Sequence, residues 1–308
     1  FRHYNNLWVI LHDIIIGLAF RQFMRQNRNV LGVIVADALE NGLAHRIQRA
    51  LLWLDSWPAG LKLNTELSRF YSHGFIGLIT QWTKLLHYCP RLMPFTVFVI
   101  ESTGIMGMTM TLALSLDVLS VLTLHLYACY LVSSTIYQQV LMLIGSLWNL
   151  FRGKRYNALR NRTDPWDYDV DQLLLGTMLF TLAAHLFPTV LVYYTVFALV
   201  RLSLIVLYAT CESLLAFMNH FPLFKLLLRS KDPQRLPGKR HVPPTADRLI
   251  DYLQSHPLPL NVVFDRYTVL WHRLTHHYHP IRLFKRSMLG QVLDTFPHTD
   301  HPSTNEAY

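Results

Sequence analysis

Charged residues are scarce in this 308-residue chain. Asp, Glu, Lys and Arg make up 15% of it and apolar types 52%, whereas an average soluble protein is about 25% charged. This deficit and the positive mean hydropathy argue against an ordinary soluble domain and predict a membrane protein with sizeable polar segments. The chain begins with Phe1 rather than Met, so we expect it to be a fragment of a longer protein.

Cysteines and catalytic motifs are also few. The three cysteines, Cys89, Cys129 and Cys211, form no CxxC pair and cannot make a disulfide framework. The sequence has no GxSxG, HExxH or GxGxxG, and Gly153-Lys154 lacks the flanking residues of a GxxxxGK[ST] phosphate loop. No stretch alternates strands and helices as a nucleotide-binding sheet does. We therefore assign no catalytic residue, no metal ligand and no cofactor.

Long apolar runs are what the chain has instead. A spanning helix needs roughly 20 mostly apolar residues, because lipid tolerates only backbone that is hydrogen-bonded internally. The runs predict an all-α, polytopic membrane protein with about five spans, near residues 7–24, 93–115, 118–148, 172–195 and 197–219. We expect a tight turn at Ser115-Leu116-Asp117 and the last boundary between Pro188 and Arg201.

Two further stretches, 33–55 and 66–88, have the periodicity of amphipathic helices. In the first, apolar residues recur every three or four positions, while Arg46 and Arg49 lie on another face. Such helices lie in a membrane surface or pack on a partner. We expect a membrane domain over 1–222, and a basic, proline-rich and partly disordered tail over 223–308.

Lysine and arginine predict the topology. Residues 21–91, 151–171 and 221–290 are rich in both, and they share one side only if the runs 92–150 and 172–220 each cross twice. The positive-inside rule then places these loops and the tail in the cytoplasm. A glycan on Asn161, the only glycosylation acceptor in the chain, would contradict this topology. The net charge of +9 fits anionic lipid headgroups better than nucleic acid, because the cations cluster beside apolar runs.

One charged connector, FRGKRYNALRNRTDPWDYDVDQ, separates two of the apolar runs. Its first half is cationic and its second half acidic. The candidates for lipid or partner binding are Arg152, Lys154, Arg155, Arg160, Arg162, Asp167, Asp169 and Asp171. The cations face the inositol phosphate or neighbouring anionic lipids in one hypothesis, and they only set the topology in the other.

The acids of this connector contain two overlapping DxD patterns, Asp167-Tyr168-Asp169 and Asp169-Val170-Asp171. In some glycosyltransferases such a pair holds a divalent ion against a nucleotide sugar, because hard cations prefer carboxylate oxygens. Two structural alternatives compete with this one. Asp164 or Asp167 caps the next helix, or the acids pair with the cations upstream.

Other polar residues stand among the apolar ones. The HxxxHH pattern of His272, His276 and His277 could bind iron or zinc. Membrane di-iron oxidases need several such boxes and this chain has one, so a basic interfacial helix is favoured. The ionisable residues within apolar runs are His12, Asp13, Glu101, Asp117, His125, His185, Arg201 and Glu212. They form either a proton or transport path or buried contacts between helices, and we favour the contacts.

Several segments together resemble a known family. They are LFRGKRYNALRNRTDPWDYDVDQLLLGTMLFTL, LFPTVLVYYTVFALVRL, RALLWLDSWPAGLKLNTELSRFYSHGF and, more loosely, LHDIIIGLAF. They resemble the signature regions of the PIG-Q family, the Q subunit of the GPI-GlcNAc transferase. The resemblance covers roughly Leu7 to Pro222, whereas the tail from Leu223 onward is expected to match little.

The resemblance implies a multi-pass protein of the endoplasmic reticulum membrane, in a complex that transfers N-acetylglucosamine from UDP-GlcNAc to phosphatidylinositol. This reaction takes place on the cytoplasmic face and starts GPI-anchor biosynthesis. The family's chemistry is assigned to the PIG-A subunit, with PIG-C, PIG-H, PIG-P and PIG-Y types as further partners. We therefore expect a non-catalytic scaffold subunit. The alternatives are a subunit whose acidic loop contributes to the active site and, less favoured, a membrane di-iron oxidase.

Overall fold

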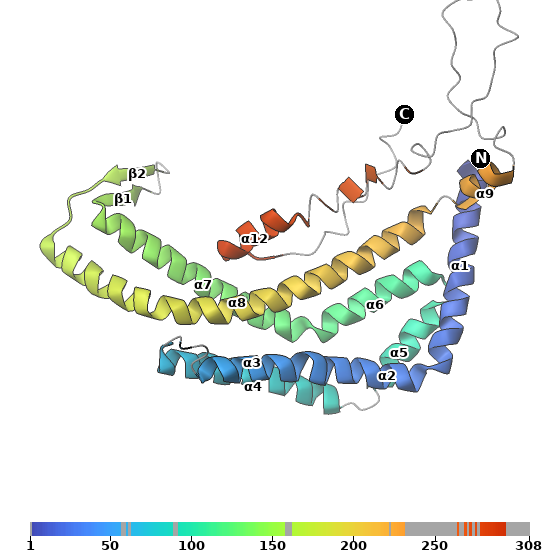
Figure 1. Cartoon of the computed structure of the whole chain (residues 1–308), viewed down its shortest axis with the longest axis horizontal. Helices are drawn as coiled ribbons and strands as arrows, with labels where there is room; N and C mark the ends of the chain where they lie inside the picture. Colours follow the sequence, from blue (N-terminus) through green and yellow to red (C-terminus); the bar gives the residue numbers. More distant parts are fainter. Residues whose placement is uncertain are drawn as a thin grey trace, which may run out of the picture.

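The computed structural model describes residues 2–56, 60, 63–88, 92–157, 162–221, 223–231, 264, 268–269, 271–272, 275 and 278–293. Apart from one short hairpin, the regular structure in these residues is helical (Figure 1), so the predicted all-α class is confirmed. Three of the described helices, over Asn6–Gln26, Leu124–Phe151 and Val170–Asn219, are long and apolar enough to cross a membrane.

The first helices form a bent frame. Helix α1 (Arg2–Gln26) ends at Asn27, whose backbone and side-chain nitrogens both donate to the carbonyl of Phe23. Helix α2 (Arg28–Asp37) then leaves in a new direction and continues through the π-helix η1 (Ala38–Ala44) into α3 (His45–Asp55) (Figure 1). Single-turn π segments are uncommon and often mark functional positions.

Helix α4 (Thr65–Tyr88) buries its apolar face against α3 and against the longest helices of the chain. The ring of Tyr71 stacks on Phe75 and Tyr193, with centroids 5.8 and 5.1 Å apart, and Phe75 lies 4.4 Å from Phe197. Burial raises the pKa of Tyr71 above its ordinary value. Helices therefore occupy residues 28–55 and 65–88, and the buried residues of α3 and α4 pack within the chain itself.

The turn predicted at Ser115-Leu116-Asp117 is wrong. Those residues lie inside α6 (Met108–Leu122), and the chain turns between α5 (Leu92–Thr103) and α6, where Gly107 has a φ of 132°. The reason is a close approach of α1, because a Cβ on Gly17 would lie 2.6 Å from the carbonyl oxygen of Gly104. The segment 93–115 is consequently two short helices rather than one.

The last two predicted spans form one helix. Helix α8 (Val170–His220) continues for 51 residues through Pro188 and curves along its length (Figure 1). A proline inside a helix removes one backbone hydrogen bond and bends it without necessarily ending it. At 1.5 Å per residue α8 is about 75 Å long, more than twice a bilayer core of about 30 Å. The number of membrane crossings stays a prediction.

Helix α7 (Leu124–Phe151) runs beside α8, and the two are joined by strands β1 (Lys154–Asn157) and β2 (Arg162–Pro165). Helices α2 to α4 lie on one side of this curved pair, and α12 (Pro280–Met288) lies on its concave side (Figure 1). Helix α9 (Leu223–Lys231) follows α8. Thus part of the predicted tail packs on the helices, while residues 232–263 and 294–308 lie outside the described residues.

Candidate functional site: a charged hairpin between two apolar helices

The connector that the sequence singles out contains an antiparallel hairpin, an element that sequence reasoning missed. Its register pairs Lys154 with Pro165 and Asn157 with Arg162. Gly153 opens it with a φ of 60°, which favours glycine, and its carbonyl accepts a hydrogen bond of 2.9 Å from the backbone of Trp166. We call residues 152–157 and 162–169 the charged hairpin. Residues 158–161, and with them Arg160 and Asn161, lie outside the described residues.

The described cations divide between the two faces of the hairpin, because successive side chains of a strand alternate. Arg155 and Arg162 share one face, where Arg155 lies 4.9 Å over the ring of Trp166 and Arg162 forms an ion pair of 2.7 Å with Asp164. Arg152 and Lys154 are exposed, and Lys154 belongs to the opposite face. The structure therefore does not bring the four described cations of the connector into one cluster.

The predicted acids lie together along the strand-to-helix link. Asp167, Asp169 and Asp171 are all exposed. Asp169 occupies the N-cap position of α8 without a capping bond from its side chain, and Asp171 lies in the first turn, where a carboxylate suits the helix dipole. Capping by Asp164 or Asp167 is wrong, because the N-cap position belongs to Asp169, and Asp164 lies in β2, where it pairs with Arg162.

Metal binding was a further hypothesis for the acids and the histidines. Within the described residues no group of three or more His, Cys, Asp or Glu side chains is placed to hold a metal ion. His272 is exposed, whereas His276 and His277 lie outside the part of the chain that the structure describes. The link before α8 therefore offers carboxylates to solvent but no assembled ligand set among the described side chains.

A second polar site was missed altogether. Hydroxyl and guanidinium groups of α7 and α8 bind the backbone of residues 287–293, at the end of α12 and just after it. Ser134 and Tyr194 donate hydrogen bonds of 2.7 Å to the carbonyls of Gly290 and Ser287. The other donors to this backbone are Tyr130, Tyr137 and Arg201, at 3.1 to 3.3 Å from Gln291, Met288 and Leu293 respectively. We call residues 278–293 the carboxy-terminal clasp.

Local chemistry explains why the clasp fits. The last carbonyls of a helix lack partners within it, and here Tyr194 and Tyr137 donate to two of them, Ser287 and Met288. Gly290 reverses the chain after α12 with a φ of 67°, and a Cβ there would lie 3.0 Å from the ring of Tyr137. Leu283 and Leu293 bury their side chains at the two ends of the contact. Tyr278 adds a hydrogen bond of 2.9 Å to Glu212.

Ionisable residues within the apolar runs find partners inside the chain. Asp13 of α1 accepts hydrogen bonds of 2.9 and 2.7 Å from the backbone and hydroxyl of Thr109, in the first turn of α6. Arg28 donates from Nε to the buried Glu101 at 3.0 Å. Arg201 and Glu212 of α8 bond to Leu293 and Tyr278 of the clasp, so all of these polar contacts join segments of this chain. Asp117 and His185 are exposed.

Fold and site define a helical membrane protein whose polar contacts mostly serve its own assembly. A family model described as "N-acetylglucosaminyl transferase component (Gpi1)" matches residues 1–238. The chain belongs to this family, as the resemblance of its segments predicts. No solved structure matches the fold.

Curated relatives extend the match. A Schizosaccharomyces pombe protein named "N-acetylglucosaminyl-phosphatidylinositol biosynthetic protein gpi1" is 40% identical over 286 residues, 90% of this chain and 44% of that protein. The Saccharomyces cerevisiae "Phosphatidylinositol N-acetylglucosaminyltransferase subunit GPI1" is 33% identical over 94% of this chain and 49% of its own length. The Homo sapiens "Phosphatidylinositol N-acetylglucosaminyltransferase subunit Q" is 35% identical over 79% of this chain and 33% of its own.

The coverage of these relatives has two consequences. The chain spans less than half the length of each of them. Because 90% of 308 residues is more than 222, the similarity to the Schizosaccharomyces pombe protein reaches into the tail. The expectation that the tail matches little is therefore wrong, in keeping with a clasp that packs on α7 and α8.

Proposed function

We propose that this chain acts as a non-catalytic, stabilising subunit of the complex that transfers N-acetylglucosamine from UDP-GlcNAc to phosphatidylinositol, the first step of GPI-anchor biosynthesis. The observation that carries the proposal is the similarity to relatives named as subunits of this transferase, over 76 to 94% of the chain. Catalysis then belongs to a PIG-A type subunit.

Exposed apolar surface supports an assembling role. In the most apolar 18-residue stretch of α1, only 11% is buried within the chain. The corresponding share in α8 is 44%. Leu7, Ile10 and Ile15 are each more than half exposed. A surface of this kind needs lipid or other apolar helices around it. PIG-C, PIG-H, PIG-P and PIG-Y type subunits are the partners we propose for it.

We also propose the location and topology of the chain. It resides in the endoplasmic reticulum membrane, with residues 21–91 and 151–171 and the tail in the cytoplasm. What supports this is the distribution of Lys and Arg. A glycan on Asn161, detected by its sensitivity to a glycosidase, would overturn it.

The decisive experiment co-purifies the tagged protein from membranes in mild detergent and identifies the chains that accompany it. Formation of GlcNAc-phosphatidylinositol is then assayed with the protein alone, with the other subunits alone and with the whole complex. We expect no turnover by the protein alone and a less abundant or less active complex in its absence. Turnover by the isolated protein would refute the non-catalytic role.

The cations of the charged hairpin serve lipid binding in this proposal. Each cation near an anionic membrane contributes about 1 kcal/mol, so exposed groups such as Arg152 and Lys154 raise the local concentration of phosphatidylinositol. Replacing the candidate cations by Gln should raise the KM for this lipid at unchanged complex abundance. Arg46→Gln with Arg49→Gln, on exposed positions of α3, is the matched control. An unchanged KM would mean that the cations set the topology and do not bind the lipid substrate.

The acidic link before α8 supports a second candidate function, direct participation in the transferase site. Asp169 and Asp171 are exposed, and Asp169 makes no capping bond with its side chain, so both carboxylates are available for a cation. Asp169→Asn with Asp171→Asn tests this, with Asp117→Asn as an exposed control. A normally assembled complex whose turnover falls by orders of magnitude would favour the second candidate over the first.

A further inference from the structure

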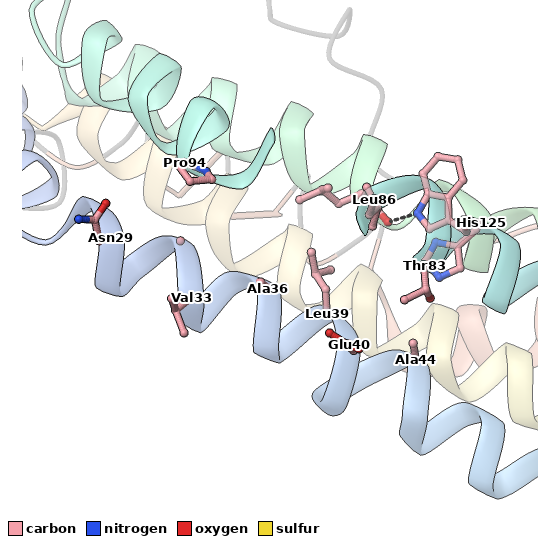
Figure 2. Close-up of a pocket in the computed structure, with 13 residues that line it drawn as sticks. Asn29, Val33, Ala36, Leu39, Glu40, Ala44, Thr83, Leu86, Pro94 and His125 are labelled. Carbon is pink, nitrogen blue, oxygen red and sulfur yellow. Dashed lines mark hydrogen bonds between the residues drawn. The ribbon is translucent and has the colours of Figure 1, made fainter. Parts of the chain in front are cut away.

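Apolar surface stays open at several places in the described part of the chain. A pocket of about 400 Å³ between α2, η1 and α4 is one of them (Figure 2), but its lining does not identify an occupant. The outer face of α12 is another, and the charges beside that face do identify one.

Helix α12 is bound to the rest of the chain by one side only. Leu283 is buried, and hydroxyl groups of α7 and α8 hold the carbonyls at the end of the helix. Ile281, Phe284 and Met288 lie away from this contact, and they are 72, 65 and 57% exposed. Residues three, four or seven apart share one face of a helix. These three therefore form a continuous apolar stripe, which we call the outer stripe of α12.

Cations flank the outer stripe. Lys285 follows Ile281 by four residues and precedes Met288 by three, so it lies next to both on the helix surface. Arg286 belongs to the same last turn and is also exposed. The side chains of Lys285 and Arg286 have no acidic partner among the described residues.

The sequence around α12 supplies no acid either. From Arg266 to Leu293 the chain has five Lys and Arg residues and no Asp or Glu. An apolar stripe beside such cations is complementary to an apolar surface that carries negative charge. An uncharged helix or a neutral lipid would cover the stripe but would leave the cations beside it without partners.

The shape around α12 distinguishes two anionic surfaces, a lipid leaflet and a protein helix. Helix α12 lies on the concave side of the curved α7–α8 pair, and both ends of the pair bend toward that side (Figure 1). A flat leaflet would meet these ends before it reached α12. A helix is a rod about 10–12 Å wide, and a rod can lie between the two ends, so the shape favours a helix.

We propose that the outer stripe of α12 docks an apolar helix of another subunit, and that an Asp or Glu of that helix pairs with Lys285. The inference rests on the proposed function for the presence of other subunits, but not for the chemistry of the transfer.

Carbodiimide cross-linking of the purified complex tests the ion pair, because this reagent joins a lysine amine to a carboxylate only where the two are in contact. We expect Lys285 to be linked to an Asp or Glu within an apolar segment of another subunit, identified by mass spectrometry of the joined peptides. Lys285→Arg is the control, because it keeps the charge and the complex but removes the cross-link.

Three results of this cross-linking would overturn the proposal. They are a link from Lys285 only to acids of this chain, no link in an intact complex, and a chain that purifies alone. The first two leave the proposed function standing, whereas the third contradicts both.

A photoreactive phenylalanine analogue in place of Phe284 tests the apolar contact. We expect it to label the same subunit that Lys285 is linked to. Labelling of lipid alone would assign the outer stripe to the membrane and overturn the proposal. The Tm should stay constant, because this side chain is exposed.

Charge reversal provides the matched comparison. Lys285→Glu with Arg286→Glu should lower the labelling from position 284 by about tenfold or more, since like charges then face each other. Arg46→Glu with Arg49→Glu, on exposed positions of α3, should leave the labelling unchanged. Full labelling after the reversal in α12 would refute the charge complementarity on which the proposal rests.

Discussion

The charged hairpin and the carboxy-terminal clasp are built in opposite ways. The hairpin is held by contacts among its own residues, such as Arg155 with Trp166 and Arg162 with Asp164, and its cations and acids are largely exposed. The clasp joins residues 278–293 to two long helices through buried hydroxyl groups and Arg201. In this chain, dense charge marks a surface, while uncharged polar side chains within apolar helices hold distant segments together.

Energetics explain this difference. An exposed ion pair contributes about 0–1 kcal/mol, because water solvates both partners well. A buried acceptor that loses its donor costs about 1–3 kcal/mol. Several such acceptors meet in the clasp, so we expect it to matter more for the stability of the fold than the hairpin does.

Removing the tyrosine hydroxyls of the clasp should have the largest effect. The triple change Tyr130→Phe, Tyr137→Phe and Tyr194→Phe keeps the rings. It removes the side-chain donors to the carbonyls of Met288 and Gln291, one of the two donors to that of Ser287, and the acceptor of the Leu293 N–H. We expect a loss of about 3 kcal/mol or more, seen as a lower Tm in detergent and faster proteolysis within 278–293. Tyr156→Phe in the hairpin is the control and should change Tm little. Equal effects of the two would refute the contrast between the regions.

A matched pair of glycines sharpens the comparison. Gly290 in the clasp and Gly153 in the hairpin both have a positive φ, 67° and 60°. Changing either to Ala should cost about 1 kcal/mol in backbone strain. Gly290→Ala should cost more, because its Cβ meets the ring of Tyr137 at 3.0 Å, whereas the nearest atom at Gly153 is 3.5 Å away. Chemical denaturation of the two variants measures the difference, and a larger loss for Gly153→Ala would contradict it.

Much of the fold could be predicted from periodicity and apolar length. The helix α4 and the long apolar helices follow from patterns within one segment. The turn at Gly104 to Gly107 could not, because it depends on the close packing of Gly17 from another helix. Small residues in an apolar run carry no local sign of what will lie against them.

The site was predicted only in part, for a similar reason. The charges of the hairpin are evident in sequence, although their division between two faces requires the strand register. The donors of the clasp are tyrosine, serine and arginine residues scattered through apolar runs, and their acceptors lie 92 to 161 residues away along the chain. No spacing rule in a sequence predicts hydrogen bonds between residues that lie so far apart along the chain. The sequence offers one hint of these donors: each such tyrosine lies three to seven residues from another polar residue, on the same face of its helix.

A smaller effect is expected from Asp164→Asn in the hairpin. This change removes the charge that pairs with Arg162 at 2.7 Å and weakens the acceptor for Asn157. An exposed pair contributes about 0.5 kcal/mol, so hydrogen exchange of the hairpin amides should rise roughly twofold while Tm stays constant. Asp167→Asn, the same change in the exposed link, should alter neither. A fall in Tm would show that the hairpin supports the fold beyond its own residues.

Salt should have the smallest effect and should separate the two regions without any mutation. Between about 0.1 and 1 M salt the Debye length falls from about 10 to 3 Å, which weakens exposed ion pairs such as Arg162 with Asp164. Hydrogen exchange in the hairpin should therefore accelerate by less than about twofold. The clasp should exchange at an unchanged rate, because its donors are mostly uncharged hydroxyls and Arg201 binds a backbone carbonyl rather than a carboxylate. Acceleration in the clasp alone would mean that its stability rests on charge, and the contrast between the two regions would then fail.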